Sequence, residues 1–124
     1  MKDNVKKTDF GYEITWIVTE AYTGKILVFE NPGVKTPMLF HKEQTKSWFI
    51  NTGRFRMRWI DTKDGKLYQS DIQEGSVFHI PQNMPHSIES LSAGASISQI
   101  SDKNMESDNF IIISPDNIGD GDAR

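Results

Sequence analysis

The apolar residues of this chain come in short runs, which turn-forming residues interrupt at intervals of about ten residues. The runs are rich in Ile, Val, Phe, Trp and Thr, and none keeps the 3.6-residue apolar period of an amphipathic helix. Strands at this spacing are typical of an all-β sandwich or barrel. We therefore predict strands at residues 12–18, 23–30, 36–41, 47–51, 54–60, 66–71, 77–80, 87–91, 96–101 and 109–114.

The clearest hairpin covers residues 48–60, where the tripeptide Asn-Thr-Gly at 51–53 forms a tight turn. Apolar and basic side chains alternate after this turn, and successive side chains of a strand point to opposite faces. The predicted inner set consists of Trp48, Ile50, Phe55, Met57 and Trp59. The outer set consists of Arg54, Arg56 and Arg58, a stripe that fits a solvated outer face better than an anion-binding surface.

Length and charge limit the chain to one domain and exclude several kinds of partner. A chain of 124 residues that is 36% hydrophobic supplies one core, which we place at about residues 11–115. The polar ends, residues 1–8 and 116–124, are expected to be flexible. A net charge of −3, with no long apolar run and no secretory signal, predicts a cytoplasmic protein that binds a small molecule but neither nucleic acid nor membrane.

No cysteine is present, so any metal must be held by histidine, carboxylate or amide groups. Two segments gather such groups, GVKTPMLFHKEQTKSWFINTG at residues 33–53 and GSVFHIPQNMPHSIES at residues 75–90. His41 and Glu43 are two residues apart and share a face on one strand, while His86 opens the strand after a turn. This set of two histidines and one carboxylate suits Fe(II), Mn(II), Zn(II) or Ni(II). The alternative is a metal-free barrel whose histidines are only hydrogen-bonded.

The two segments resemble the two conserved motifs of the cupin superfamily. In the first motif a Gly precedes His-x-His, a Glu follows, and a second Gly lies seven residues after that Glu. Here His41 and Gly53 match, Glu43 stands at the second His, and Lys46 stands at the Glu. The resemblance implies a double-stranded β-helix, which is a jelly-roll barrel in which the two motifs meet.

The second motif usually reads G-x5-P-x-G-x2-H-x3-N. Here Gly75, Pro81 and His86 match, whereas Asn83 replaces the second Gly and Ser90 replaces the Asn. The match implies that His86 lies inside the barrel.

A narrower resemblance concerns the ligand. The segments FGYE at 10–13, YTGKIL at 22–27 and KSWFINTG at 46–53 are similar to those of mannose-6-phosphate-isomerase-like cupins. That resemblance implies a metal-dependent, isomerase-like enzyme acting on a sugar phosphate or nucleotide sugar, in which Lys46 or a metal-bound water moves a proton. Two alternatives stay open: a non-catalytic, metal-free cupin that binds or senses a small metabolite, and a cupin lyase or dioxygenase.

Lys46 is the sharpest departure from the cupin pattern. In a dry barrel its pKa would fall, which would suit a catalytic base or an anion clamp. Base rates favour the other orientation, in which the aliphatic stem lines the rim and the ammonium stays in water. The remaining candidates to line a substrate are Gln44, Trp48, Phe55, Met57, Trp59, His79 and Gln99. For His79 an outward or hydrogen-bonded orientation is favoured.

Assembly is the last expectation from the sequence. Barrels of this kind leave strand edges that pair across a two-fold axis. We expect a homodimer, with residues 12–18 as the strand that is exchanged.

Overall fold

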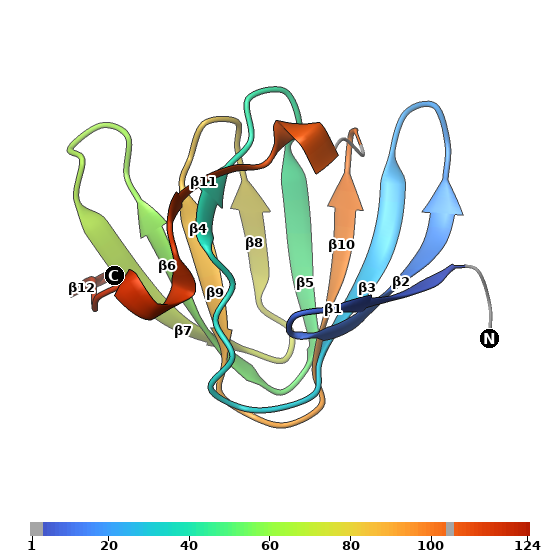
Figure 1. The fold of residues 1–124 in the computed structure, drawn as a ribbon, viewed down its shortest axis with the longest axis horizontal. Helices are drawn as coiled ribbons and strands as arrows, with labels where there is room; N and C mark the ends of the chain where they lie inside the picture. The colour runs from blue at the N-terminus through green and yellow to red at the C-terminus, as the bar shows by residue number, and fades with distance from the viewer. Residues whose placement is uncertain (1–3, 104–105) are drawn as a thin grey trace.

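The computed structural model describes residues 4–103 and 106–124, which fold into two six-stranded sheets (Figure 1). Sheet A has the order β1-β2-β3-β10-β5-β8, and sheet B has the order β11-β4-β9-β6-β7-β12. Neighbouring strands are antiparallel throughout, except that β12 runs parallel to β7. The predicted all-β jelly-roll barrel is confirmed.

Each predicted strand is present, with ends that differ by at most two residues. Sheet A contains β1 (Val5–Thr8), β2 (Gly11–Val18), β3 (Thr23–Phe29), β5 (Lys46–Thr52), β8 (Val77–Ile80) and β10 (Ala95–Ser101). Sheet B contains β4 (Met38–Phe40), β6 (Arg54–Ile60), β7 (Leu67–Gln73), β9 (His86–Ser90), β11 (Phe110–Ile113) and β12 (Asp122–Ala123). Two 3-10 helices, η1 (Glu106–Asp108) and η2 (Pro115–Asn117), flank β11. Neither helix of the described residues is long and apolar enough to cross a membrane.

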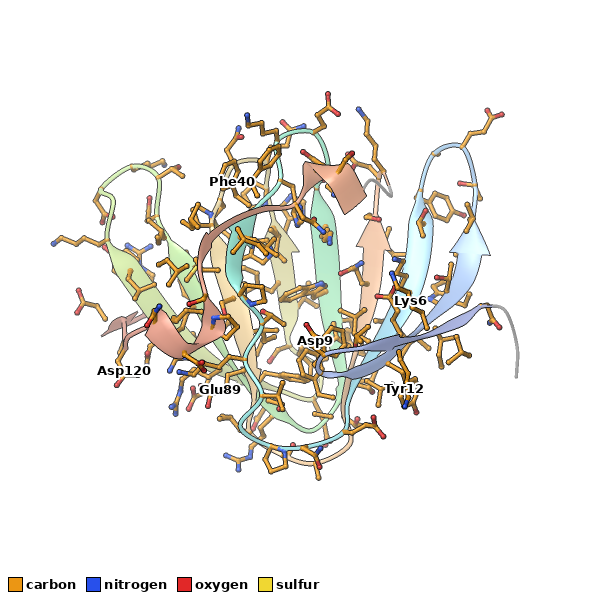
Figure 2. All side chains as sticks on the ribbon, viewed as in Figure 1. Lys6, Asp9, Tyr12, Phe40, Glu89 and Asp120 are labelled. Carbon is orange, nitrogen blue, oxygen red and sulfur yellow. The ribbon has the colours of Figure 1, made fainter. Side chains whose placement is uncertain are left out.

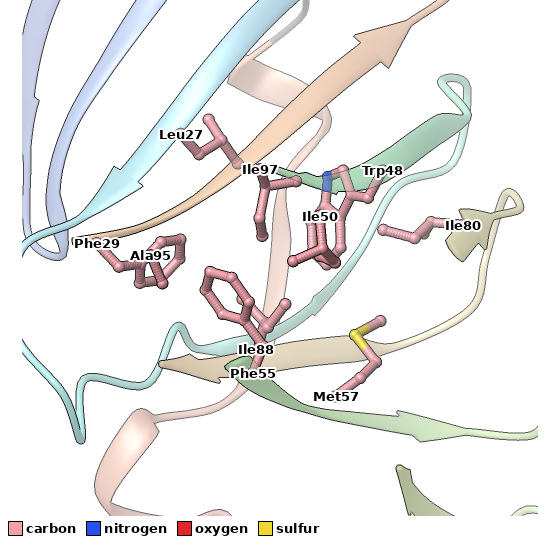
Figure 3. Close-up of a cluster of buried hydrophobic side chains, with 10 residues drawn as sticks. All are labelled: Leu27, Phe29, Trp48, Ile50, Phe55, Met57, Ile80, Ile88, Ala95 and Ile97. Atoms are coloured by element: carbon pink, nitrogen blue, oxygen red, sulfur yellow. The ribbon is translucent and has the colours of Figure 1, made fainter. Parts of the chain in front are cut away.

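The core lies between the two sheets and is built by alternation along their strands (Figure 3). Phe29 of β3 meets Phe55 of β6 edge to face, with ring centroids 5.1 Å apart. Packing of this kind between layers is what excludes water from a jelly roll. The other members of the cluster are Leu27, Trp48, Ile50, Met57, Ile80, Ile88, Ala95 and Ile97.

The C-terminal segment packs against sheet B. Ile118 is only 5% exposed, the backbone N–H of Gly121 donates to Oε1 of Gln69 at 2.9 Å, and β12 pairs with β7. Residues 116–124, which were expected to be flexible, are thus held to sheet B at these points in the structure. At the other end, β1 pairs with β2, while residues 1–3 lie outside the described residues.

The arginine stripe of β6 is not uniformly solvated. Arg54 is exposed, and Arg56 forms a two-pronged salt bridge with Asp71. Arg58 is only 3% exposed, because its guanidinium donates to Gln69, Glu89 and Asp120. Figure 2 shows Glu89 and Asp120 on the same side of the molecule, where the C-terminal segment covers β6. Arg58 therefore ties this segment to the sheet.

The predicted strand exchange meets an obstacle in this arrangement. β2 is paired on both sides, with β1 and with β3. An exchange of residues 12–18 would require β1 to leave first. The homodimer itself stays a prediction.

Replacing Arg58 tests how much the C-terminal segment depends on it. Arg58→Leu should lower the free energy of unfolding by about 2–3 kcal/mol, because it leaves the half-buried Glu89 carboxylate without its cation. Arg56→Leu is the matched control on the same face of β6, and its exposed pair with Asp71 predicts a loss below about 1 kcal/mol. Urea unfolding of both variants measures the difference. Equal losses would contradict this role of Arg58.

Candidate functional site

A cavity of about 450 Å³ lies between the sheets. Both sheets contribute to its wall, and so does the connection between β4 and β5. The polar side chains that line it include His41, Gln44, Lys46, His86 and Gln99. Residues of β1 and of the turn that follows it, including Lys6 and Asp9 (labelled in Figure 2), line the same cavity.

His41 follows β4 and is almost completely buried. Its Nδ1 lies 3.2 Å from the main-chain carbonyl oxygen of Asp108. Nδ1 donates to this carbonyl oxygen when it carries the proton of the neutral ring, and accepts from Nε2 of Gln44, 3.4 Å away, when Nε2 of His41 carries it. That Nε2 is buried and has no hydrogen-bond partner among the described residues. Burial, and secondarily the charge of Lys46, lowers the pKa of His41, so the ring is neutral near pH 7.

His86 opens β9 and has the same arrangement. Its Nδ1 lies 3.0 Å from the carbonyl oxygen of Met84 and therefore donates to it, which leaves the lone pair on Nε2. Burial lowers the pKa of His86 to about 3. The rings of His41 and His86 are 5.2 Å apart between centroids, and Trp48 packs against His86 at 5.8 Å. The cavity thus contains two neutral imidazoles side by side.

Asp108 holds the loop that carries this site. Its carboxylate accepts hydrogen bonds from the backbone N–H groups of Lys42, Glu43 and Gln44, at 2.9, 3.0 and 3.0 Å. Burial opposes ionisation of Asp108, but these N–H donors outweigh it and hold its pKa below the ordinary value. Sequence analysis missed Asp108, because no local pattern links it to a loop more than sixty residues earlier.

The second cupin segment is joined to the same loop. The backbone N–H of Asn83 donates to the carbonyl oxygen of His41 at 2.6 Å. Asn83 has φ = 67°, in the left-handed region that Asn tolerates better than most residues. Asn can therefore occupy a position where the cupin motif has Gly.

Lys46 begins β5 and points into the cavity, because it shares a face with the buried Trp48 and Ile50. This is the inward orientation, which base rates had disfavoured. Burial, and next the charge of Lys25, lowers the pKa of Lys46 to about 8, while Glu13 acts in the opposite direction. Lys25 is itself paired with Glu13, at 3.3 Å. Within the described part of the chain, Lys46 forms no hydrogen bond or ion pair.

The structure brings together only part of the predicted set of metal ligands. Glu43 is exposed and lies outside the cavity lining, since its backbone N–H is bound to Asp108 and its side chain points away. Gln44, one residue later, is buried and lines the cavity instead. The reason is local: residues 41–45 form an irregular connection, so the two-residue alternation of a strand does not hold there.

The predicted lining residues divide into two groups. Gln44, Trp48 and Gln99 line the cavity, and the indole N–H of Trp48 donates to Oε1 of Gln99 at 2.9 Å. The other four lie elsewhere in the molecule.

Phe55 and Met57 belong to the apolar core, and Trp59 packs edge to face on Phe78. His79 is exposed on the outer face of sheet A, with its Nδ1 3.0 Å from Oγ of Ser47. The outward orientation favoured for His79 is the one found.

These residues supply two histidines but not the carboxylate of the predicted divalent metal centre. Carbonyl partners on Nδ1 orient His41 and His86 in the manner usual for metal-bound histidines. Among residues 4–103 and 106–124, however, no three His, Cys, Asp or Glu side chains come together as a metal-binding group. The Lys46 ammonium occupies the position of the usual carboxylate, and it would repel a dication. The donor set is therefore incomplete for the predicted metal.

Comparison with known families decides the identity of the fold. A family model described as "Cupin" matches residues 19–114, which include both motif segments. The chain belongs to the cupin family. The predicted superfamily resemblance is confirmed at this level.

Oxalate decarboxylases are among the proteins similar to this chain. Oxalate decarboxylase OxdC of Bacillus subtilis is 32% identical over 78 residues, which are 63% of this chain and 20% of that protein. The chain therefore spans about a fifth of the length of this curated relative. The narrower resemblance to mannose-6-phosphate-isomerase-like cupins stays a prediction.

Two solved structures show the same fold at low identity. Oxalate decarboxylase from Bacillus subtilis at pH 4.6 superposes with a TM-score of 0.76 at 23% identity, over 87% of this chain and 29% of that chain. The formate complex of Lactobacillus farciminis oxalate decarboxylase superposes with a TM-score of 0.70 at 18% identity, over 87% of this chain and 33% of that chain.

Lys46 should destabilise the folded barrel. The pKa of Lys46 is about 8 in the folded chain, whereas that of an ordinary lysine is 10.5, so the unfolded chain binds more protons between these values. Stability contributed by this position therefore rises with pH from about 8 to 10.5, and the penalty is fully present below pH 8. Lys46→Met should raise the free energy of unfolding at pH 7 by up to about 3 kcal/mol.

Urea unfolding of Lys46→Met at pH 7 and at pH 10 measures this effect. The gain over the original chain should be smaller at pH 10, because the original Lys46 is then largely neutral. A variant that is less stable at pH 7 would contradict the buried-cation interpretation.

Proposed function

We propose that this cupin domain binds a small anionic metabolite in its cavity, and that Lys46 rather than a metal ion holds the anion. The single observation that carries the proposal is the Lys46 side chain, which is only partly exposed, lines the cavity and has no hydrogen-bonded partner in the described part of the chain. A largely desolvated cation without an anion is costly, and an anionic ligand would offset that cost.

The charge of the cavity wall supports the same ligand class. The described residues that line it include Lys6, Lys7, Lys25, Lys35 and Lys46 against Asp9 and Glu13. The chain as a whole carries a net charge of −3, so this excess of cations is local. A cleft lined by one sign of charge attracts ligands of the opposite sign.

A metal-dependent enzyme is the second candidate. The observation that favours it is the pair of neutral imidazoles, each with Nδ1 bound to a carbonyl oxygen. The similarity to oxalate decarboxylases supports a lyase more than the isomerase expected from the sequence. Oxalate and sugar phosphates are both anions, so either ligand is compatible with the proposed cation site.

Loss of the Lys46 charge should weaken anion binding. Lys46→Met should weaken binding of oxalate or mannose 6-phosphate by about a hundredfold, since a hydrogen-bonded, desolvated charge pair is worth roughly 3 kcal/mol. Lys42→Met is the matched control, because Lys42 lies on the same loop but outside the cavity, over the ring of Phe110. Isothermal titration calorimetry in the presence of a chelator measures the anion affinity of both variants. An affinity of Lys46→Met for these anions equal to that of the original chain would refute the proposal.

The pH profile of the same titration is a separate prediction. Affinity for oxalate should be nearly constant below about pH 7 and should fall above the pKa of about 8, as the ammonium of Lys46 loses its proton. An affinity that does not change between pH 7 and 9.5 would show that another group holds the anion.

Reversing the charge at residue 46 should increase the affinity of the site for a divalent metal ion. Lys46→Glu places a carboxylate beside the two imidazoles, which completes a set of two histidines and one acid. Mn(II) affinity should rise by at least about tenfold over the original chain, because opposite charges a few ångströms apart attract by several kcal/mol at intermediate dielectric. Elemental analysis and Mn(II) titration test this, with Lys42→Glu as control. Tight Mn(II) binding by the original chain would instead favour the second candidate.

A further inference from the structure

The outer face of sheet A is free of Asp, Glu, Lys and Arg over five strands. Within the described strands β2, β3, β10, β5 and β8, which lie side by side in Figure 1, the charged residues are Glu13, Lys25 and Lys46 alone. All three line the cavity, so they belong to the inner side of the sheet. Since 25% of the whole chain is charged, an uncharged face of this extent sets this surface apart.

A row of paired residues crosses this outer face from strand to strand. Ile14 of β2 stands opposite Ile26 of β3. Ser98 of β10 stands between Ile26 and Phe49, and Phe49 of β5 stands opposite Val77 of β8. Directly paired residues of a sheet share one face, so four apolar side chains and one small serine form a continuous row.

Trp16 and Ile100 widen this row. Ile100 pairs with Gly24, and a Cβ atom on Gly24 would lie 2.7 Å from Cε2 of Trp16, so the indole ring covers Gly24. Trp16, Phe49 and Val77 are 53%, 47% and 70% exposed. Exposed apolar side chains gathered on one surface mark an interaction site, whereas scattered ones do not. We call the following residues the apolar face of sheet A: Ile14, Trp16, Ile26, Phe49, Val77 and Ile100.

The outer face of sheet B carries the charges that sheet A lacks. Arg56 of β6 stands opposite Asp71 of β7 and Glu89 of β9, and it forms a salt bridge with Asp71. Arg58 on the same face of β6 pairs with Glu89. The two outer faces of one barrel therefore differ in kind. Depletion of charged residues with enrichment of aromatic ones is the composition of an interface core.

The size of the apolar face of sheet A matches another sheet. Five strands at about 4.8 Å spacing, each rising about 3.3 Å per residue, cover roughly 24 Å by 20 Å. A helix is only about 10 Å wide and would leave half of that width open. Side chains that stand out from about 500 Å² of sheet bring the accessible area toward the roughly 800 Å² per partner of a standard interface.

A second copy of this chain fits these requirements. It presents a face of the same dimensions, and two sheets pack face to face at about 10 Å. A two-fold axis places each face against itself, so a charged face would bring like charges together. The apolar face of sheet A, which has no such charge among the described residues of its strands, avoids that repulsion.

We infer that the chain forms a homodimer in which the apolar face of sheet A packs against the same face of a second copy across a two-fold axis. Both sheets stay intact in this arrangement, so no strand is exchanged. The interface lies on the side of sheet A opposite to the cavity, and it does not depend on the anion site at Lys46.

A lysine placed on the apolar face of sheet A should separate the two copies. Phe49→Lys and Val77→Lys each introduce two like charges into one interface, one from each copy. Both side chains are well exposed in the single chain, so each variant should fold. The original chain should sediment with twice the mass of one chain at tens of micromolar, and each variant should raise the dissociation constant of the dimer at least about a hundredfold.

Ile111→Lys is the matched control. Ile111 is 62% exposed, but it lies on β11 at the edge of sheet B, so this variant should keep the dimer mass. The original chain offers a second measurement that needs no variant. Trp16 is the exposed one of the three tryptophans, so dilution that separates the copies should increase quenching of the tryptophan fluorescence by iodide.

Three results would overturn the inference. The first is a monomeric original chain at tens of micromolar. The second is a dimer that persists in both Phe49→Lys and Val77→Lys, or, where these variants do not fold, a dimer whose iodide quenching is unchanged by dissociation. The third is a dimer that is lost in Ile111→Lys, which would place the interface at the edge of sheet B.

Discussion

The carboxylate of Asp108 is the interaction on which the site depends. It accepts three backbone N–H groups from residues 42–44, and hydrogen bonds to a charged acceptor are stronger than neutral ones. The main-chain carbonyl oxygen of the same residue lies 3.2 Å from Nδ1 of His41 and orients its ring. Asp108 is brought there by the pairing of β11 with β4, in which Phe110 stands opposite Phe40. Asp108, which lies late in the chain, thus shapes a loop in the first half of the chain and orients the imidazole that follows β4.

The sign of the charge at Lys46 decides which chemistry the barrel permits. The usual carboxylate at this position would attract a dication to the paired imidazoles, whereas an ammonium repels one by a comparable energy. Glu13 does not neutralise Lys46, since it is paired with Lys25, and Lys25 itself lowers the pKa of Lys46. The cavity wall therefore carries a positive charge that lowers the free energy of unfolding. Folds of one family differ in function through such single positions.

Much of the fold was predictable because the two-residue alternation of side chains along a β-strand is visible in the sequence. The two-residue alternation along β5 and β6 correctly placed Trp48, Ile50, Phe55 and Met57 inside. The same alternation places Lys46 inside, since it shares the face of Trp48. The usual preference of a lysine ammonium for water favours the opposite orientation, which is not the one found. Where the chain leaves the strand the rule fails. His41 and Glu43 are separated by an irregular connection, and Gln44 reaches the cavity in place of Glu43.

Long-range partners explain what the sequence could not predict. Arg58 follows the pattern of an outward residue of an alternating strand, yet it is only 3% exposed and donates to Asp120 of the C-terminal segment. Asp108 likewise reads as a polar turn residue. In both cases a charged group gains its role from a segment far away in sequence, whose docking is settled by tertiary packing. The cavity has the same origin: β3, β5, β9, β10 and the loop held by Asp108 all supply polar groups to it. Its charge is therefore a property of the assembled barrel, and a single motif does not determine whether a cupin takes a cation or an anion.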